Sequence, residues 1–222
     1  MDSGSLPPIP PPSQLLPSYI PLKKFTTWPI DPNAPGYSTR LQGFGDTQFA
    51  WEGRNLYYRQ LGRLHNAIDI FVDSGATVVS VGDGFVVCVS CGISDPVEGY
   101  TDPGIGIYHD LCGCVMYYVH LSSFSVEQGD EVQAGQQIGS SGIGFGHEHL
   151  HLEIRPHQGA AEFYNPLYFF DPALLIDLSY QDYHNPYLNP EWRIIGYTSK
   201  GQDGNFYSYW DGTLPSIDLL PQ

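Results

Sequence analysis

Short segments of alternating or continuous apolar residues follow one another along most of this chain, and each is bounded by Gly, Pro, Asp or Ser. Such segments are typical of β-strands. The 25 Gly and 19 Pro among 222 residues favour short strands and turns over long helices. We expect an all-β fold, an antiparallel sheet or sandwich with long loops. The predicted strands are residues 67–72, 77–81, 85–90, 105–109, 115–121, 136–140 and 149–155.

The strand pattern divides the chain into three regions. Residues 1–22 are a Pro-rich arm that lacks the basic start and apolar stretch of a secretory signal peptide. Residues 23–170 are expected to form one domain, in which residues 48–63 have no clean periodicity and are predicted to form an irregular loop. Residues 171–222 are a Tyr-rich extension that is expected to pack on the domain. Its first part, 171–177, could form a short helix with Pro in the first turn.

Two histidines one residue apart, His149 and His151, lie in the last predicted strand. Their side chains share one face of the strand, about 6 to 7 Å apart, so that one could bind a metal while the other faces its open side. Catalytic zinc usually has three protein ligands and a fourth position for water. His65, Asp69 and His151 would be such a set. His120 and His149 would then handle protons and stabilise an oxyanion.

The other four histidines have no such context. A lone imidazole in a β-rich chain is usually a hydrogen-bonded or surface residue, and we expect that role here. These residues are His109, His147, His157 and His184.

The net charge of −15, with nine Lys plus Arg and no basic run, excludes most nucleic-acid-binding proteins. It also disfavours non-specific attachment to anionic walls or lipids. The chain has no run of about 18 apolar residues, so no membrane span is expected.

The order of the motifs resembles peptidase family M23, the LytM or lysostaphin-type metallopeptidases, over about residues 42 to 170. The matching pieces are Gly43-Phe44-Gly45, His65 to Asp69, Val81 to Val87, Tyr118 to Leu121, Gly129 to Gln136, Ile138 to Gly142, and His149 to Glu153. The resemblance implies Zn²⁺ ligands and catalytic histidines at the five positions predicted above. Two positions depart from the family pattern: Ala67 stands where Gly is frequent, and Glu148 where Pro is frequent. Neither change removes a metal donor.

The family acts on peptides of bacterial cell walls. The resemblance therefore implies an endopeptidase that cuts cross-bridge or stem peptides of peptidoglycan with a zinc-activated water. We expect such an enzyme to be a monomer in an extracellular, periplasmic or cell-wall-associated location. The sequence does not specify whether His120 or His149 acts as the base.

Two other functions deserve comparison. A zinc-containing module could bind wall peptides or activate an amidase without cutting, although the presence of both His120 and His149 favours an enzyme. Residues 126–139 also resemble biotinyl and lipoyl carrier domains. Those domains attach their cofactor to a lysine, and this chain has no lysine between Lys24 and Lys200, which excludes a carrier.

Four cysteines lie on either side of one predicted hairpin: Cys88, Cys91, Cys112 and Cys114. An even number in an exported protein favours disulfides, and three pairings are possible. A structural zinc held by four thiolates is the alternative, although the second pair lacks the usual two-residue spacer.

The loops expected to select the substrate are residues 46–64, 92–104 and 156–165. The second of these carries Asp95, Glu98 and Asp102, which we expect to be solvated, although they could favour a cationic diamino-acid side chain. Tyr118 precedes His120 by two residues and would share its strand face. We expect Tyr118 to be a core or rim aromatic; the alternative is a phenol donor to the oxyanion.

Overall fold

The computed structural model describes residues 23–45, 47–53, 65–92, 102–160, 163–180, 197–200 and 206–209. The predicted Pro-rich arm lies outside the described residues. So do residues 54–63 of the predicted irregular loop and residues 93–101 of the predicted loop 92–104.

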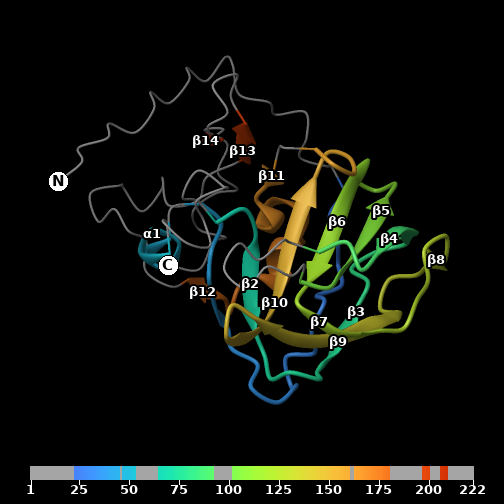
Figure 1. Ribbon diagram of the computed structural model, residues 1–222, viewed down its shortest axis with the longest axis horizontal. Coiled ribbons are helices and arrows are strands. Elements are labelled where there is room, and N and C mark those ends of the chain that lie inside the picture. Colours follow the sequence, from blue (N-terminus) through green and yellow to red (C-terminus); the bar gives the residue numbers. More distant parts are fainter. Residues whose placement is uncertain are drawn as a thin grey trace.

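A long strand, β10 (His147–Arg155), runs through the middle of the main sheet (Figure 1). Its antiparallel partners are β2 (Ile68–Phe71), β6 (Cys114–Val119), β9 (Gln137–Gly144) and β11 (Phe163–Tyr164). Beyond β6 the sheet continues through β5 (Gly104–His109), β4 (Gly84–Val89) and β8 (Glu131–Val132). Beyond β11 it continues through β13 (Tyr197–Lys200) and β14 (Phe206–Tyr209).

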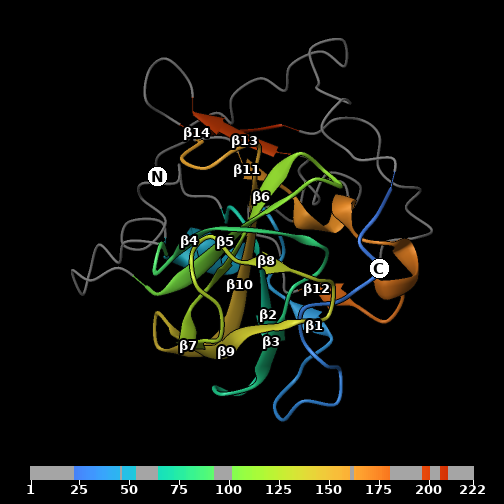
Figure 2. The same cartoon turned by 90° about the vertical axis from the view of Figure 1, so that its right-hand side faces the viewer.

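Strand β9 runs across the lower end of β10 in Figure 1, and Figure 2 shows it beside β7. Its further antiparallel partners are β3 (Thr77–Val79) and β7 (Leu121–Phe124). A small parallel pair joins β1 (Arg40–Leu41) to β12 (Ser179–Tyr180). The described helices are short: α1 (Gln48–Glu52) and the 3-10 helices Pro166–Phe169 and Pro172–Leu174.

The predicted all-β antiparallel fold is confirmed, with three local differences. The predicted strand at 115–121 is interrupted at His120 and becomes β6 and β7. Residues 48–52, predicted as irregular, form α1, where the Thr47 hydroxyl accepts the Ala50 N–H at the start of the helix. The predicted helix at 171–177 is reduced to the 3-10 helix Pro172–Leu174, capped by Asp171.

The alternation in β10 separates the core from the polar face of the sheet. Leu150, Leu152 and Ile154 are fully buried in the main apolar core. The residues between them, His149, His151 and Glu153, therefore point to the opposite face. Strand β2 follows the same rule, since Ile68 and Ile70 join the core and place Asp69 opposite.

His120 reverses this alternation at the end of β6. Its φ angle is 61°, a left-handed conformation that is uncommon outside glycine. Tyr118 lies in the core with no exposed surface, and its hydroxyl accepts the Val81 N–H at 3.0 Å. His120, two residues later, instead lies among the histidines of the polar face. The prediction that both share a face is wrong, because the left-handed residue breaks the strand period; Tyr118 is a core aromatic, as expected.

The two ends of the described domain pack together. Phe25 and Phe170 form a parallel bridge, in which Phe25 N–H donates to Phe169 and Asp171 N–H donates to Phe25, each at 2.8 Å. Leu175 and Leu178 are buried in the same core. Residues on both sides of position 170 thus contribute to one core.

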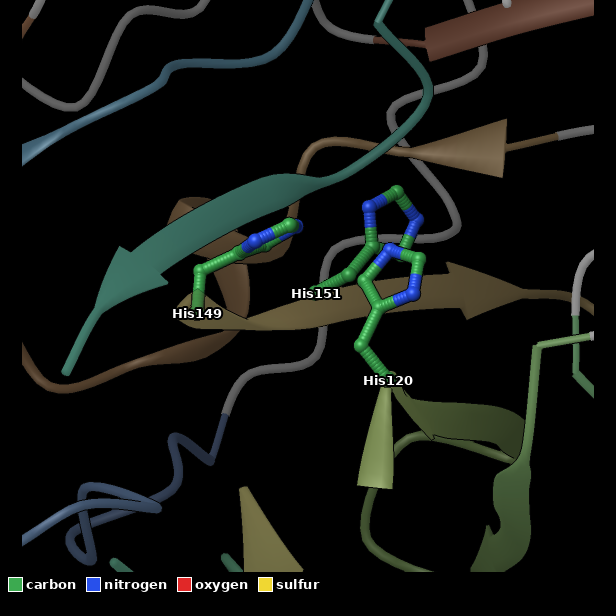
Figure 3. Close-up of side chains that lie close together, drawn as sticks. All are labelled: His120, His149 and His151. Atoms are coloured by element: carbon green, nitrogen blue, oxygen red, sulfur yellow. The ribbon is translucent and has the colours of Figure 1, made fainter. Parts of the chain in front are cut away.

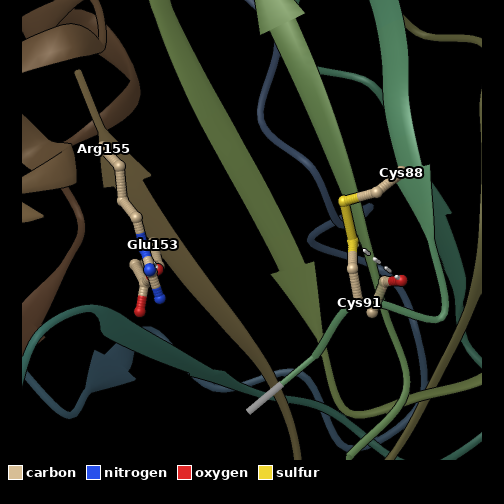
Figure 4. The surroundings of a disulfide bond; sticks show 5 residues. Cys88, Cys91, Glu153 and Arg155 are labelled. Carbon is tan, nitrogen blue, oxygen red and sulfur yellow. Dashed lines mark hydrogen bonds and ion pairs between the residues drawn. A yellow bond between two sulfur atoms is a disulfide. The ribbon is translucent and has the colours of Figure 1, made fainter. Parts of the chain in front are cut away.

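The cysteines form two local disulfides, Cys88–Cys91 and Cys112–Cys114. The sequence prediction of bridges is confirmed, and the alternative of a four-thiolate zinc site is wrong, because each sulfur is bonded to its near neighbour. Cys88–Cys91 closes the end of β4 next to β5 (Figure 4), where Cys91 N–H donates to the Gly104 carbonyl at 3.1 Å.

His109 is a structural residue, as the sequence predicted. Its Nδ1 donates to the Asp83 carbonyl at 2.9 Å, and its ring packs edge-on against Phe25. Burial disfavours the charged imidazolium and lowers the pKa of His109 to about 4. The unfolded chain therefore binds a proton that the native protein excludes, between a pH of about 6.5 and about 4.

Acidification through this window is expected to weaken the fold by way of His109. The contribution of His109 to the free energy of unfolding should be fully present above a pH of about 6.5. It should decrease by roughly 3 kcal/mol as the pH falls to about 4. Urea unfolding of the wild type and of His109→Asn at pH 7 and pH 4.5 measures the effect. The variant keeps an amide donor but cannot titrate, so its loss should be smaller. Equal losses in both proteins would contradict the assignment.

No helix in the described part of the chain is long and apolar enough to cross a membrane.

Candidate metal centre

The backbone of residues 42–45 positions both His65 and Asp69. Gly45 and His65 exchange backbone hydrogen bonds of 2.7 and 2.8 Å, and Gln42 and Asp69 exchange bonds of 3.2 and 3.0 Å. Nδ1 of His65 lies 2.7 Å from the Gly43 carbonyl oxygen. Because a carbonyl only accepts, Nδ1 carries the proton and Nε2 keeps its lone pair for a metal. The Gly-Phe-Gly motif thus holds the first predicted ligand.

Asp69 and His151 are neighbours across the sheet. They face each other in the register of β2 and β10, and Asp69 Oδ1 lies 2.9 Å from His151 Nδ1 and 3.2 Å from His65 Nε2. Burial alone would raise the pKa of Asp69, but electrostatic interactions with His65 and His149 and the imidazole hydrogen bonds hold it well below its usual range. Asp69 is therefore ionised, which is the form that binds metal.

The donor atoms of His65, Asp69 and His151 lie within 4.8 Å of one another, and all three residues are buried. Tetrahedral zinc with N and O ligands at about 2.0 to 2.2 Å holds its donors roughly 3.4 Å apart. The two contacts of Asp69 with the histidines are close to that spacing. The donor set and its spacing fit a zinc ion.

His149 lies on the same strand as His151. Its Nδ1 donates to the His147 carbonyl at 3.0 Å, and its Nε2 lies 3.7 Å from Asp69 Oδ1. Burial lowers the pKa of His149 to about 4, despite the nearby carboxylate. The ring is therefore neutral near pH 7, with a lone pair on Nε2.

His120 completes the cluster from the end of β6 (Figure 3). Its ring centroid is 4.6 Å from that of His149 and 5.5 Å from that of His151. Burial lowers the pKa of His120, an effect that Asp102 partly opposes. Donor atoms of His120, His149 and His151 also lie within 4.8 Å of one another. His151 thus belongs to both groups, and the five predicted residues form one continuous buried cluster.

Glu153 lies behind His151. Its carboxylate accepts a hydrogen bond from Arg155, which lies beside it in Figure 4. It also accepts a hydrogen bond from Asn66 and lies 3.9 Å from His151 Nε2. Burial opposes the charge on His151, but the carboxylates of Asp69 and Glu153 outweigh it and raise its pKa to about 9. A carboxylate behind a ligand histidine fixes its ring and tautomer. The sequence motif contained Glu153, but no role was predicted for it.

Asp102 was predicted to be solvated, and this is wrong. It is 1% exposed, and its Oδ2 lies 3.4 Å from His120 Nδ1. Asp95 and Glu98 of the same loop lie outside the described residues. Of the histidines expected to be structural, His147 and His157 have exposed rings, and His184 lies outside the described residues.

A buried cluster of three candidate metal donors and two further histidines lies on one face of an antiparallel sheet, an arrangement that could hold a catalytic metal. Residues 63–163 match the model of peptidase family M23. This match supports the resemblance to that family over somewhat less than half of the chain.

Two curated relatives match part of the chain. The glycyl-glycine endopeptidase ALE-1 of Staphylococcus capitis is 35% identical over 98 residues, which cover 41% of this chain and 25% of that protein. The stage II sporulation protein Q of Bacillus subtilis is 43% identical over 81 residues, 35% of this chain and 26% of that protein. The matches thus span about a quarter of each relative. Among solved structures, a zinc-containing peptidase from Vibrio cholerae is 27% identical over 60% of this chain and 36% of its own, with a TM-score of 0.43.

Proposed function

We propose that this protein is a zinc-dependent endopeptidase that hydrolyses peptide bonds of bacterial cell-wall peptidoglycan. The observation that carries the proposal is the cluster itself. Five polar side chains from three separate segments are buried together at 0 to 5% exposure on one face of the sheet. Burying such groups without a partner is costly, and a metal with its substrate would satisfy them.

In this proposal, His65, Asp69 and His151 hold the zinc. When bound, zinc supplies Lewis-acid polarisation of the scissile carbonyl and makes water a better nucleophile near neutral pH. Glu153 keeps the His151 ring oriented, with Nδ1 towards the metal side. The Gly43 carbonyl does the same for His65 by holding its Nδ1 proton.

His120 and His149 perform the proton transfers. Both rings are buried next to the donor group, which excludes bulk water from them. A neutral imidazole can accept the proton of the attacking water and return it to the leaving amine. Once it has taken up that proton, the ring carries an Nε2–H that can donate a hydrogen bond to the oxyanion of the tetrahedral intermediate, and the second ring lines the same site.

The substrate class is inferred from similar proteins and not from the shape of a pocket. The family match supports a peptide substrate, and the similarity to a glycyl-glycine endopeptidase supports a peptide that contains glycine. The cell wall as the source of this peptide is what the family resemblance implies. We extend this to an extracellular, periplasmic or wall-associated monomer. The alternative of a binding module that does not cut predicts the same zinc and a different outcome in the assay below.

Incubation of purified protein with peptidoglycan, followed by mass analysis of the released muropeptides, tests the proposal. We expect new peptide ends, which disappear with a chelator and return with added zinc. The masses identify the bond that is cut. Binding to peptidoglycan without any released product would favour the non-cutting module instead.

A further inference from the structure

The Asp102 carboxylate is buried without a hydrogen bond. Neither of its oxygens has a hydrogen-bond partner in the described structure, and its Oδ2 lies 3.4 Å from His120 Nδ1. A buried carboxylate without a partner is unfavourable, so it needs a cationic or donating neighbour. The adjacent imidazole can supply such a donor.

The backbone that follows Asp102 is held by sheet pairing. The Pro103 carbonyl accepts the Leu121 N–H at 3.0 Å, directly after His120, and the Gly104 carbonyl accepts the Cys91 N–H at 3.1 Å. Gly92 packs against the Asp102 carbonyl so closely that a Cβ there would lie 1.3 Å from the oxygen. The Cys88–Cys91 disulfide closes this corner (Figure 4). Sheet pairing of the residues that follow it, together with the close contact of Gly92, therefore fixes the position of Asp102.

The imidazole ring of His120 packs against Gly144. A Cβ on Gly144 would lie 2.2 Å from its Nδ1 and 2.3 Å from two ring carbons, so the ring lies flat against this glycine. Both ring nitrogens are buried and have no hydrogen-bond partner among the described residues. The left-handed φ of 61° is a strained conformation of the kind found at functional sites. A strained, closely packed imidazole next to a carboxylate indicates a ring with one required orientation.

We propose that Asp102 is a positioning residue for His120: it accepts the Nδ1 proton and leaves the Nε2 lone pair for the reacting groups. A carboxylate that fixes the tautomer of a catalytic imidazole is a recurring arrangement, and such contacts often tighten only in the substrate complex. His149 uses a backbone carbonyl for the same purpose. The inference rests on the proposed function for its effect on turnover, but not for its effect on the tautomer.

The tautomer can be measured without any reaction. Nitrogen-15 NMR of the histidine rings in the zinc-loaded full chain, with His120 assigned by loss of its signals in His120→Gln, should show a protonated Nδ1 in the wild type. Asp102→Asn presents an amide donor to Nδ1 and should shift His120 towards the opposite tautomer. Asp102→Ala, which lacks any acceptor, should also lose the wild-type preference. Asp110→Asn, an exposed carboxylate in the turn after β5, is the matched control and should leave the signals unchanged.

Kinetics separates positioning from a structural or substrate-binding role. We expect Asp102→Asn to lower kcat by about 10- to 100-fold, with KM, zinc content and Tm little changed. In a His120→Ala background the same substitution should have no further effect, because Asp102 acts through that ring. Asp110→Asn should behave as the wild type.

Several results would overturn the inference: an unchanged tautomer in both Asp102 variants, an unchanged kcat, or an undiminished effect in the His120→Ala background. A rise in KM alone would make Asp102 a substrate contact, and joint loss of zinc and Tm would make it structural. If the wild type releases no muropeptide, the proposed function fails, while the NMR comparison still decides the role of Asp102.

Discussion

Alanine at His65, Asp69 or His151 is expected to reduce the zinc content from about one ion per chain to near zero, and hydrolysis with it. Each residue supplies one of three buried donors, and a site with two protein donors holds zinc much more weakly. Elemental analysis of the purified variants, alongside muropeptide release, measures both effects. Loss of the Asp69 carboxylate should be the most severe, since its Oδ1 contacts both ligand histidines.

His157→Ala is the matched control for this experiment, because His157 is an exposed histidine outside the cluster. It should retain the zinc content of the wild type. Full zinc occupancy in all three ligand variants would refute the assignment of His65, Asp69 and His151.

The second large effect is expected at the two remaining histidines, without loss of metal. His120→Ala and His149→Ala should each lower kcat by a factor of roughly 10² to 10⁴, as is typical for removal of an acid or base group. Zinc content should stay near that of the wild type, because neither residue belongs to the proposed ligand set. Steady-state kinetics on a wall peptide and elemental analysis of the same samples provide the measurements.

Loss of zinc in the His120 and His149 variants would instead point to a different metal site. His120, His149 and His151 also form a group with donor spacing suited to a metal. If His120→Ala and His149→Ala lose zinc while His65→Ala keeps it, the metal lies in that second group, and the roles of the histidines exchange.

The strand pattern was sufficient to predict β10 and its two faces. A period of two distinguishes Leu150 and Leu152 from His149 and His151 without any tertiary information. The same rule failed between Tyr118 and His120, because one residue with a positive φ restarts the alternation on the other face. Such a residue is not marked in the sequence unless it is glycine or asparagine.

Asp102 was missed although the sequence contained a usable signal. The β5 and β6 hairpin turns at 110–113, and its register pairs His109 with Cys114 and Gly104 with Val119. Counting outward from that turn places residue 103 opposite His120, and hence Asp102 beside it. A loop composition of acidic residues suggested solvation instead. The pairing between β5 and β6 determines the burial of Asp102, and the composition of the loop does not predict this pairing.

Some features depend on contacts that no local pattern encodes. The backbone pairing of residues 42–45 with His65 and Asp69 joins segments separated by a predicted loop. The choice of Cys88–Cys91 and Cys112–Cys114 among three possible pairings depends on the register of β4, β5 and β6. Short strands such as β8 and β11 have two residues each, too few for a period to be recognised.

The left-handed backbone conformation of His120 implies a trade-off between thermal stability and the proposed catalytic activity. A non-glycine residue in this conformation costs about 1 to 2 kcal/mol, which glycine would recover. Directed evolution that selects for heat resistance alone would therefore favour glycine here and remove the imidazole to which we assign a proton transfer. Improvement of this protein for industrial or medical use would have to leave that one residue out of the search.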